Sequence, residues 1–510
     1  MMNTKRLLCA VLLLSLLAAV LCPVFSFAEE ETITLRICNW EEYIDQGDWD
    51  EEEVIDLESG DIFGENSLVD DFETWYEETY GKKVHVEYST FGTNEDLYNM
   101  LTIGDVYDLV CPSEYMIMKL MAEDKVQMLS EDFFDEDNEN NYYVRGVSPY
   151  IRNIFETHDI NGVTWDKCAA GYMWGITGFV YNPEVLSEED ASTWKLLENP
   201  GPDDPETSQT EAEYRRRITM KDNVRDAYFA AVGALKSEKL TDEAFTGRED
   251  YAMALQDEMN DVSPETVDAA QTYLQTIRDN LYSFETDSGK ADMITGKVVA
   301  NYQWSGDAVY AMDQAEEDDY ILNFAIPREC TNIYFDGWIM LKSGISEDPA
   351  KQQAAEAFIN FISRPDNVVR NMYYIGYTSV ISGGEDGRVF EYLDWNYSAE
   401  EDEEDVVEYP VGYFFAGEED NEDYVLTVPE EQLHRQLSAQ YPSGEVIRRA
   451  SIMVYFNEAQ SELINRMWIR VRCFNIQSVP VWFWITLGAL IILGILFGIR
   501  RKIAKERLYS

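Results

Sequence analysis

The sequence predicts an α/β protein in which helices cover a mostly parallel sheet. Apolar residues alternate with polar ones over 33–37 and again over 84–88, which is the spacing of strands. Between them, apolar residues recur at helical spacing over 68–76, and Gly81 ends this predicted helix. The segment Tyr107-Asp108-Leu109-Val110 indicates a buried strand. Strands that alternate with helices are typical of parallel sheets.

Two further helices are predicted, one that begins near Thr93 and one at 354–362. Thr93 and Asn94 are polar residues that open a short helix before the strand at 107–110. Residues 354–362 form a later amphipathic helix, and Pro365 limits its extent because the residue before a proline avoids helical geometry. A chain of 510 residues with 45% hydrophobic residues is long enough for two domains and is not globally disordered.

The formal net charge of -58 argues strongly against nucleic acid as a partner, because phosphate neutralisation requires Lys and Arg. Two interpretations remain open: the charge attracts cations, or it only keeps an exported protein soluble. Acidic stretches at 45–61, 131–139 and 400–423 are predicted to be solvated loops. They lack the Gly and terminal Glu positions of a calcium loop, so no metal site is predicted.

Residues 1–28 have the three parts of a signal peptide. Lys5 and Arg6 give a basic start, residues 7–21 form an apolar segment, and small residues precede a cleavage site before Glu29. We therefore expect the protein to be exported.

Residues 481–499 are apolar and uncharged, and as a helix they would extend roughly 28 Å, close to the thickness of a bilayer core. Trp482 and Trp484 stand where interfacial aromatics occur, and the tail 500–510 is basic. The positive-inside rule therefore predicts a single-pass membrane helix with a cytoplasmic C-terminus and an extracytoplasmic region before Val481.

Enzyme and metal-site patterns are not found in the sequence. The three histidines are far apart, and no nucleophile elbow, phosphate loop or metalloprotease helix occurs. The cysteines outside the signal peptide are scattered, which predicts neither a disulfide framework nor a zinc site. We expect no catalytic residue and no cofactor.

Aromatic residues stand beside carboxylates at the ends of several predicted strands, at 39–43, 112–115, 304–307 and 334–336. In open α/β sheets, ligands bind beyond the carboxyl ends of strands. Aromatic faces attract organic cations, and carboxylates pair with ammonium groups. Together these segments predict an amine-binding site, although any single aromatic could instead belong to the core.

The segments 38–43, 107–115, 361–366 and 375–377 resemble the spermidine/putrescine-binding proteins of bacterial ABC importers. The resemblance extends over residues 34–380. It implies a type II periplasmic-binding-protein fold, with two α/β lobes, hinge crossovers and a ligand in the cleft between the lobes.

The resemblance also implies which residues bind the ligand. They are Trp40, Glu41, Tyr43, Ser113, Tyr115, Asn223, Asp226, Thr286, Trp304, Tyr334, Asp336 and Tyr377. Asn223 departs from the family because an acidic residue is common there, and Tyr334 stands where a tryptophan is usual. Met453 lies near the place of a glutamine contact. These departures affect the identity of the ligand more than its class.

The expected two-lobed region covers residues 29–477. We expect the first lobe at 31–170 and 331–378, and the second at 171–330 and 379–470.

The expected function is capture of polyamines, putrescine or spermidine, by closure of the lobes, and delivery to an ABC permease with a cytoplasmic ATPase. Three alternatives stay open: the same fold binding another organic cation or an amino acid derivative, a sensory receptor, and an extracellular hydrolase.

Overall fold

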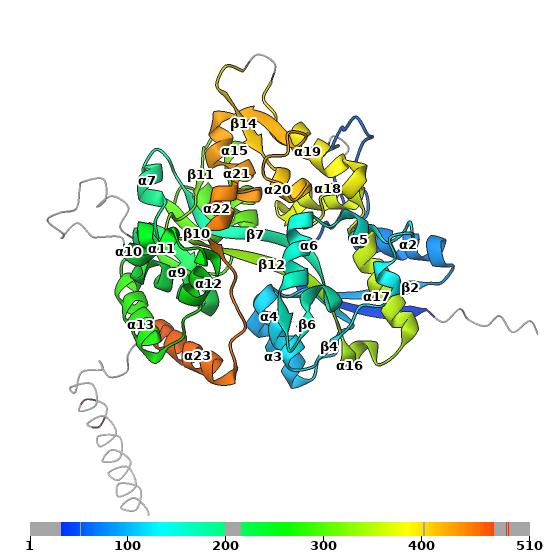
Figure 1. Cartoon of the computed structure of the whole chain (residues 1–510), viewed down its shortest axis with the longest axis horizontal. Coiled ribbons are helices and arrows are strands. Elements are labelled where there is room, and N and C mark those ends of the chain that lie inside the picture. The colour runs from blue at the N-terminus through cyan, green and yellow to red at the C-terminus, as the bar shows by residue number, and fades with distance from the viewer. Residues whose placement is uncertain are drawn as a thin grey trace, which may run out of the picture.

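The computed structural model describes residues 32–50, 53–198, 216–400 and 403–473, together with Thr486 and Gly488. Within this part, strands far apart in the sequence join one 12-stranded sheet in the order β2-β1-β3-β12-β7-β10-β8-β9, with β4 and β16 also paired to β12 and with β11 and β13 also paired to β7 (Figure 1). The strands on the main path are β1 (Ile33–Trp40), β2 (Val84–Phe91), β3 (Leu109–Val110), β7 (Ala169–Tyr181), β8 (Ile218–Lys221), β9 (Ser283–Glu285), β10 (Ala300–Trp304) and β12 (Thr331–Leu341). The additional strands are β4 (Val126–Gln127), β11 (Asn323–Ala325), β13 (Thr378–Ser379) and β16 (Ala450–Ser451).

The two longest strands, β7 and β12, connect the two halves of the molecule. They pair with each other antiparallel, and every residue in both strands is buried. The C-terminal part of β12 pairs with β3, and the C-terminal part of β7 pairs with β10. The register between them shifts at Asp336 and Gly337. Because they cross between the halves, β7 and β12 are called the hinge strands below.

Each half contains parallel strands covered by helices. In the first half, β1 pairs in parallel with β2 and β3. In the second half, β8 pairs in parallel with β10 and β9. The sheet as a whole is mixed, which corrects the prediction of a mostly parallel sheet. The reason is that the chain passes between the halves through antiparallel strands, for which the local pattern gave no signal.

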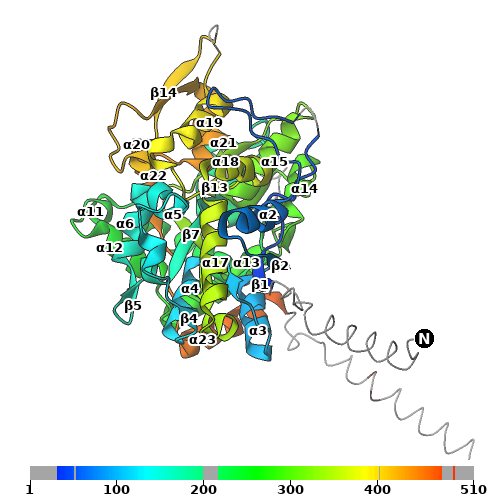
Figure 2. The same ribbon diagram turned by 90° about the vertical axis from the view of Figure 1, so that its right-hand side faces the viewer.

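The helices of the two halves cover both faces of this sheet (Figures 1 and 2). The longer ones are α2 (Leu68–Tyr80), α3 (Asn94–Ile103), α4 (Glu114–Ala122), α6 (Pro149–Thr157), α9 (Val224–Leu235), α12 (Tyr251–Met259), α13 (Pro264–Arg278), α15 (Ser305–Glu316), α17 (Pro349–Ile362), α18 (Pro365–Ile375), α19 (Arg388–Tyr397) and α23 (Glu458–Arg472).

Local signals placed several helices correctly. Gly81 ends α2 in a left-handed conformation, φ 65°, and its N–H donates to the carbonyl of Glu77. The side chain of Thr93 caps α3 by accepting from the N–H of Asp96. The predicted helix at 354–362 is confirmed as α17, which begins earlier, at Pro349, because proline suits the first turn.

The C-terminal part of the described chain packs against both halves. α19 packs on α18, and α20 (Gly412–Phe415) packs on α6 of the first half. In contrast, α21 (Gln436–Gln440) packs on α15, and α23 packs on α13 of the second half. The hairpin of β14 (Val406–Pro410) and β15 (Val425–Pro429) projects beyond α19 (Figure 2). The assignment of residues 379–470 to the second lobe stays a prediction.

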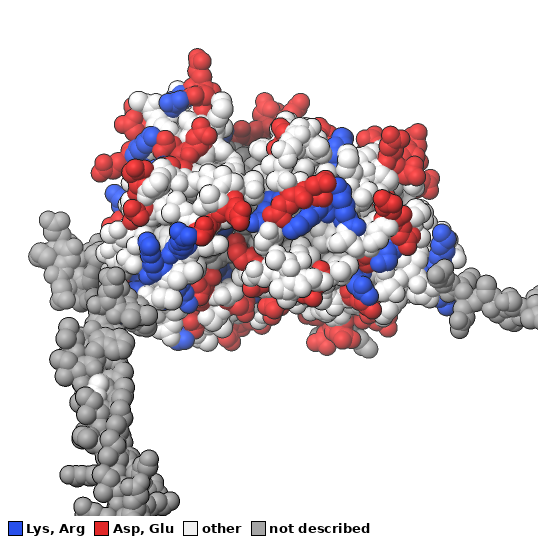
Figure 3. All heavy atoms as spheres, turned by 90° about the horizontal axis from the view of Figure 1, so that it is seen from below, with Lys and Arg blue, Asp and Glu red and all other residues white. Residues whose placement is uncertain are grey.

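The acidic side chains are not confined to one place on the surface. Asp and Glu occur in separate groups across the face seen in Figure 3, with Lys and Arg between them. The prediction of solvated loops is wrong in part for two acidic stretches. The stretch 400–423 contains β14 and the buried helix α20, because apolar residues interrupt its acidic ones. In the stretch 45–61, Asp45 is fully buried. Its burial is explained by Arg370, which pairs with it.

Predictions at the two ends fall outside the described residues. The signal peptide at 1–28 is not described, and of the predicted membrane helix at 481–499 only Thr486 and Gly488 are. In the described ranges, no helix has both the length and the apolar composition required to cross a bilayer.

Candidate ligand-binding site

A cavity of about 140 Å³ lies where the two halves meet at the hinge strands. One water molecule needs roughly 10–15 Å³ on the same kind of measure, so the cavity can hold a small organic molecule. All of the residues that the sequence assigned to the site line it: Trp40, Glu41, Tyr43, Ser113, Tyr115, Asn223, Asp226, Thr286, Trp304, Tyr334, Asp336 and Tyr377.

The ends of strands bring these residues together from distant parts of the sequence. β1 ends at Trp40, whereas β10 ends at Trp304. Ser113 lies just before α4, and Asp226 lies in the first turn of α9. Asp336 lies within the hinge strand β12, which corrects the expectation that residues 334–336 stand at the end of a strand, because the apolar run after Asp336 continues the same strand. The cavity is therefore built from both halves, as expected for a ligand beyond the carboxyl ends of strands.

Asp336 is a buried carboxylate whose hydrogen bonds come from neutral groups. The hydroxyl of Tyr43 donates to Oδ2 at 2.7 Å, and the hydroxyl of Ser113 donates to Oδ1 at 2.7 Å. Among the described residues no Lys or Arg pairs with it, and the residue is 4% exposed. Burial raises its pKa to about 6, although the two hydroxyls partly offset this effect. A carboxylate of this kind is suited to receive a cation.

Aromatic rings line the cavity that contains this carboxylate. The rings of Tyr43 and Tyr377 meet edge to face with their centroids 4.6 Å apart, and the ring centroids of Trp40 and Trp304 are 6.2 Å apart. Such faces and edges provide both apolar contact for methylene groups and electrostatic attraction for an ammonium group.

The part of the cavity wall at the start of α9, in the second half, differs in its electrostatics. The side-chain oxygen of Asn223 accepts from the N–H groups of Arg225 at 2.8 Å and Asp226 at 3.3 Å, so this residue caps α9. Burial raises the pKa of Asp226 to about 7, whereas the charge of Lys221 and a hydrogen bond from Trp304 act in the opposite direction. Met453 also lines the cavity.

Several charged residues of the site were not predicted from the sequence. Arg225 lines the cavity with its guanidinium 4.4 Å from the Tyr115 ring and 3.9 Å from the Phe456 ring. Glu114 is 1% exposed, and burial raises its pKa to about 8. Only the sequence position of Glu114, within the strand-end segment 112–115, gave a signal for it.

Asp307 is held by two lysines. Its carboxylate lies 3.3 Å from Nζ of Lys221 and 3.4 Å from Nζ of Lys290, and the hydroxyl of Tyr377 donates to it at 3.0 Å. Burial alone would raise the pKa of Asp307, but the two ammonium groups lower it overall. This carboxylate is therefore already neutralised within the protein.

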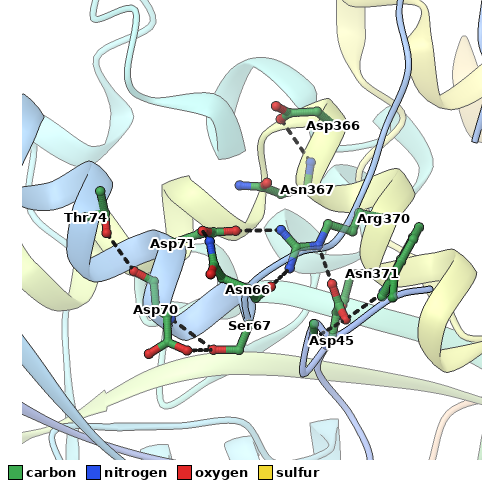
Figure 4. Close-up of polar contacts among 12 residues, drawn as sticks. Asp45, Asn66, Ser67, Asp70, Asp71, Thr74, Asp366, Asn367, Arg370 and Asn371 are labelled. Atoms are coloured by element: carbon green, nitrogen blue, oxygen red, sulfur yellow. Dashed lines mark hydrogen bonds and ion pairs between the residues drawn. The ribbon is translucent and has the colours of Figure 1, made fainter. Parts of the chain in front are cut away.

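A buried polar network fixes the loop that carries Tyr43. The hydroxyl of Tyr172 donates to the carbonyl of Tyr43 at 2.7 Å, and Asn371 donates to that hydroxyl at 2.8 Å. The N–H of Asp45 donates to Asn371 at 2.9 Å, and Arg370 pairs with Asp45 (Figure 4). The network therefore connects α18 to one wall of the cavity.

Comparison with known proteins agrees with this architecture. A family model described as bacterial extracellular solute-binding protein matches residues 67–390. A spermidine/putrescine-binding periplasmic protein of Salmonella typhimurium is 24% identical over 58% of this chain and 70% of its own length. The corresponding protein of Escherichia coli K12 is 23% identical over 68% of this chain and 78% of its own length. A putrescine/agmatine-binding protein of Pseudomonas aeruginosa is 26% identical over 56% of this chain and 69% of its own length.

Solved structures show the same fold. A putative spermidine/putrescine ABC transporter from Listeria monocytogenes superposes with a TM-score of 0.56 at 20% identity, over 87% of this chain and 100% of that one. A spermidine/putrescine substrate-binding protein of Streptococcus pneumoniae gives 0.52 at 21% identity, over 86% and 100%. The expected type II periplasmic-binding-protein fold is thereby confirmed for the described region.

Proposed function

Because the chain belongs to the bacterial extracellular solute-binding proteins, a family of binding proteins rather than enzymes, we propose that it captures polyamines and delivers them to an ABC importer. The partners would be a membrane permease and its cytoplasmic ATPase. The names of the relatives, which bind spermidine, putrescine or agmatine, support the amine class.

The observation that carries this proposal is the carboxylate of Asp336. Its two hydrogen bonds come from the hydroxyls of Tyr43 and Ser113, and burial raises its pKa. A buried carboxylate is unfavourable unless a cation pairs with it. The ammonium group of an amine fits this position, with its methylene groups against the surrounding rings.

The arrangement of the walls supports binding by closure. Asp336 and Ser113 belong to the first half, whereas Trp304 and Thr286 belong to the second. A ligand that contacts both walls favours the conformation in which the halves approach each other across β7 and β12. No bond is made or broken in this mechanism.

Calorimetric titration of the purified full chain tests the proposal. We expect heat and thermal stabilisation with amines of the putrescine and spermidine type, and none with neutral sugars. At a hundredfold excess over its dissociation constant, a ligand should stabilise the protein by about 2.7 kcal/mol. A folded protein that responds to no amine would exclude amine capture as its function.

The membrane anchor is a separate part of the proposal and depends on the sequence of residues 481–499. It predicts that the full chain sediments with membranes and that a chain ending at Gln477 does not. Equal distribution of the two chains would contradict it.

A further inference from the structure

Lys221, the last residue of β8, places a buried ammonium group behind the wall of the cavity. Its Nζ lies 4.0 Å from the centroid of the Trp304 ring and 3.3 Å from Oδ2 of Asp307. It also donates to the carbonyl of Thr286 at 2.9 Å, and its side chain is 1% exposed. Trp304 and Asp307 line the cavity and Lys221 does not, so the ammonium lies behind them.

The protein's own lysine therefore occupies one face of a ring that could otherwise attract a ligand cation. A ligand ammonium on the opposite face, also at 4.0 Å, would lie about 8 Å from Nζ of Lys221. At an effective dielectric constant of about 20, repulsion between two bare unit charges at that distance would weaken binding about thirtyfold, and the pairing of Lys221 with Asp307 reduces this effect. Trp304 is therefore suited to an apolar or neutral part of the ligand.

Asp307 and Asp226, two carboxylates that line the cavity, also interact with cations of the protein. Lys221 and Lys290 both pair with Asp307. The charge of Lys221 opposes the rise in the pKa of Asp226 that burial causes. Arg225, which precedes Asp226 in the chain, has a guanidinium that lines the same cavity. In the second half, protein cations thus pair with Asp307 and lie near Asp226, whereas Asp336 has no cationic partner among the described residues.

Trp40 provides an independent observation. Its indole N–H is buried and has no hydrogen-bond partner within the described part of the chain, although the residue lines the cavity. An indole N–H only donates, so an ammonium group cannot satisfy it. A carbonyl or hydroxyl oxygen of a ligand can, and leaving a buried donor without a partner is costly.

We propose that the cleft selects an amine with one ammonium group, bound at Asp336, and a neutral hydrogen-bond acceptor at its other end, near Trp304 and Trp40. A diamine acylated on one nitrogen has this chemistry. The inference rests on the proposed amine-binding function and specifies which amines bind best.

The direct test compares N-acetylputrescine with putrescine by calorimetric titration of the purified full chain. These two ligands share the same four-carbon spine and differ in the charge of one end. We expect N-acetylputrescine to bind at least tenfold more tightly. Putrescine binding as tightly or more tightly would overturn the inference and leave the proposed function intact, whereas binding of neither, and of no other amine, would overturn both.

Lys221→Met removes the buried charge and keeps the length of the side chain. The substitution leaves one face of the Trp304 ring and one oxygen of Asp307 without a cation. The preference for N-acetylputrescine over putrescine should therefore fall at least tenfold. Lys221→Arg should retain the preference. Lys236→Met is the matched control, because Lys236 is a partly buried lysine paired with Glu258 away from the cavity. A Lys221→Met protein with an unchanged preference would overturn the inference, and if this variant does not fold, the wild-type ratio decides.

Discussion

Replacing Asp336 with Asn removes the charge of the central carboxylate and retains its shape. In the protein without ligand, a pKa of about 6 in place of 3.8 corresponds to a penalty of about 3 kcal/mol on the ionised group. The folded-state pKa is raised, so this penalty is present at neutral pH and disappears as the pH falls below the unfolded value. The variant without ligand should therefore melt at the same or a higher temperature than wild type at neutral pH.

The same substitution should weaken ligand binding, although it does not reduce the stability of the protein without ligand. An ammonium group bound at Asp336 is a desolvated charge pair, and truncating one partner of such a pair costs about 2–4 kcal/mol. This corresponds to a loss of affinity of roughly thirty- to a thousandfold. Calorimetric titration gives the affinity, and a thermal melt without ligand shows whether the variant folds.

Asp108→Asn is the matched control, since Asp108 is fully buried in the same half but pairs with Lys351 at 2.9 Å. This control should lose stability and keep its amine affinity. A folded Asp336→Asn protein with unchanged affinity would refute the assignment of the ammonium to Asp336.

Three further predictions follow from the same geometry. Amine binding should weaken as the pH falls through about 6, because the ligand pairs with the ionised form of Asp336; an affinity unchanged between pH 7.5 and 5 would contradict this. Arg370→Met leaves Asp45 buried without its cation and should cost about 3–5 kcal/mol of unfolding free energy, measured by urea denaturation; a change below about 1 kcal/mol would show that the pair is not structural. Gly306→Ala places a Cβ within 2.4 Å of the Tyr377 ring and should weaken amine binding at least tenfold by displacing that ring; full affinity in titration would show that the ring can move without loss.

The strands and the site segments were predictable because their signals are local. Alternating apolar residues identified β1 and β2, and Gly81 marked the end of α2. Carboxylates and aromatics at predicted strand ends identified part of the cavity wall, and the resemblance to the family supplied Asn223, Asp226, Thr286 and Tyr377.

The remaining features depend on contacts between distant residues. Lys221 and Asp307 are 86 positions apart, and Asp45 and Arg370 are 325 apart. No pattern around a single lysine or arginine indicates which buried carboxylate it will neutralise. The antiparallel pairing of β7 and β12 was not predicted for a related reason, since the sequence of a buried strand does not reveal the direction of its partners.

A crystal structure of the protein with a bound amine tests the central claim most directly. The account predicts an ammonium nitrogen within about 3 Å of the Asp336 carboxylate, which is the range of a charge-assisted hydrogen bond, with the carbon spine against Tyr377 and Trp304. An amine bound with its ammonium at Asp226 and with Asp336 still held only by Tyr43 and Ser113 would contradict it.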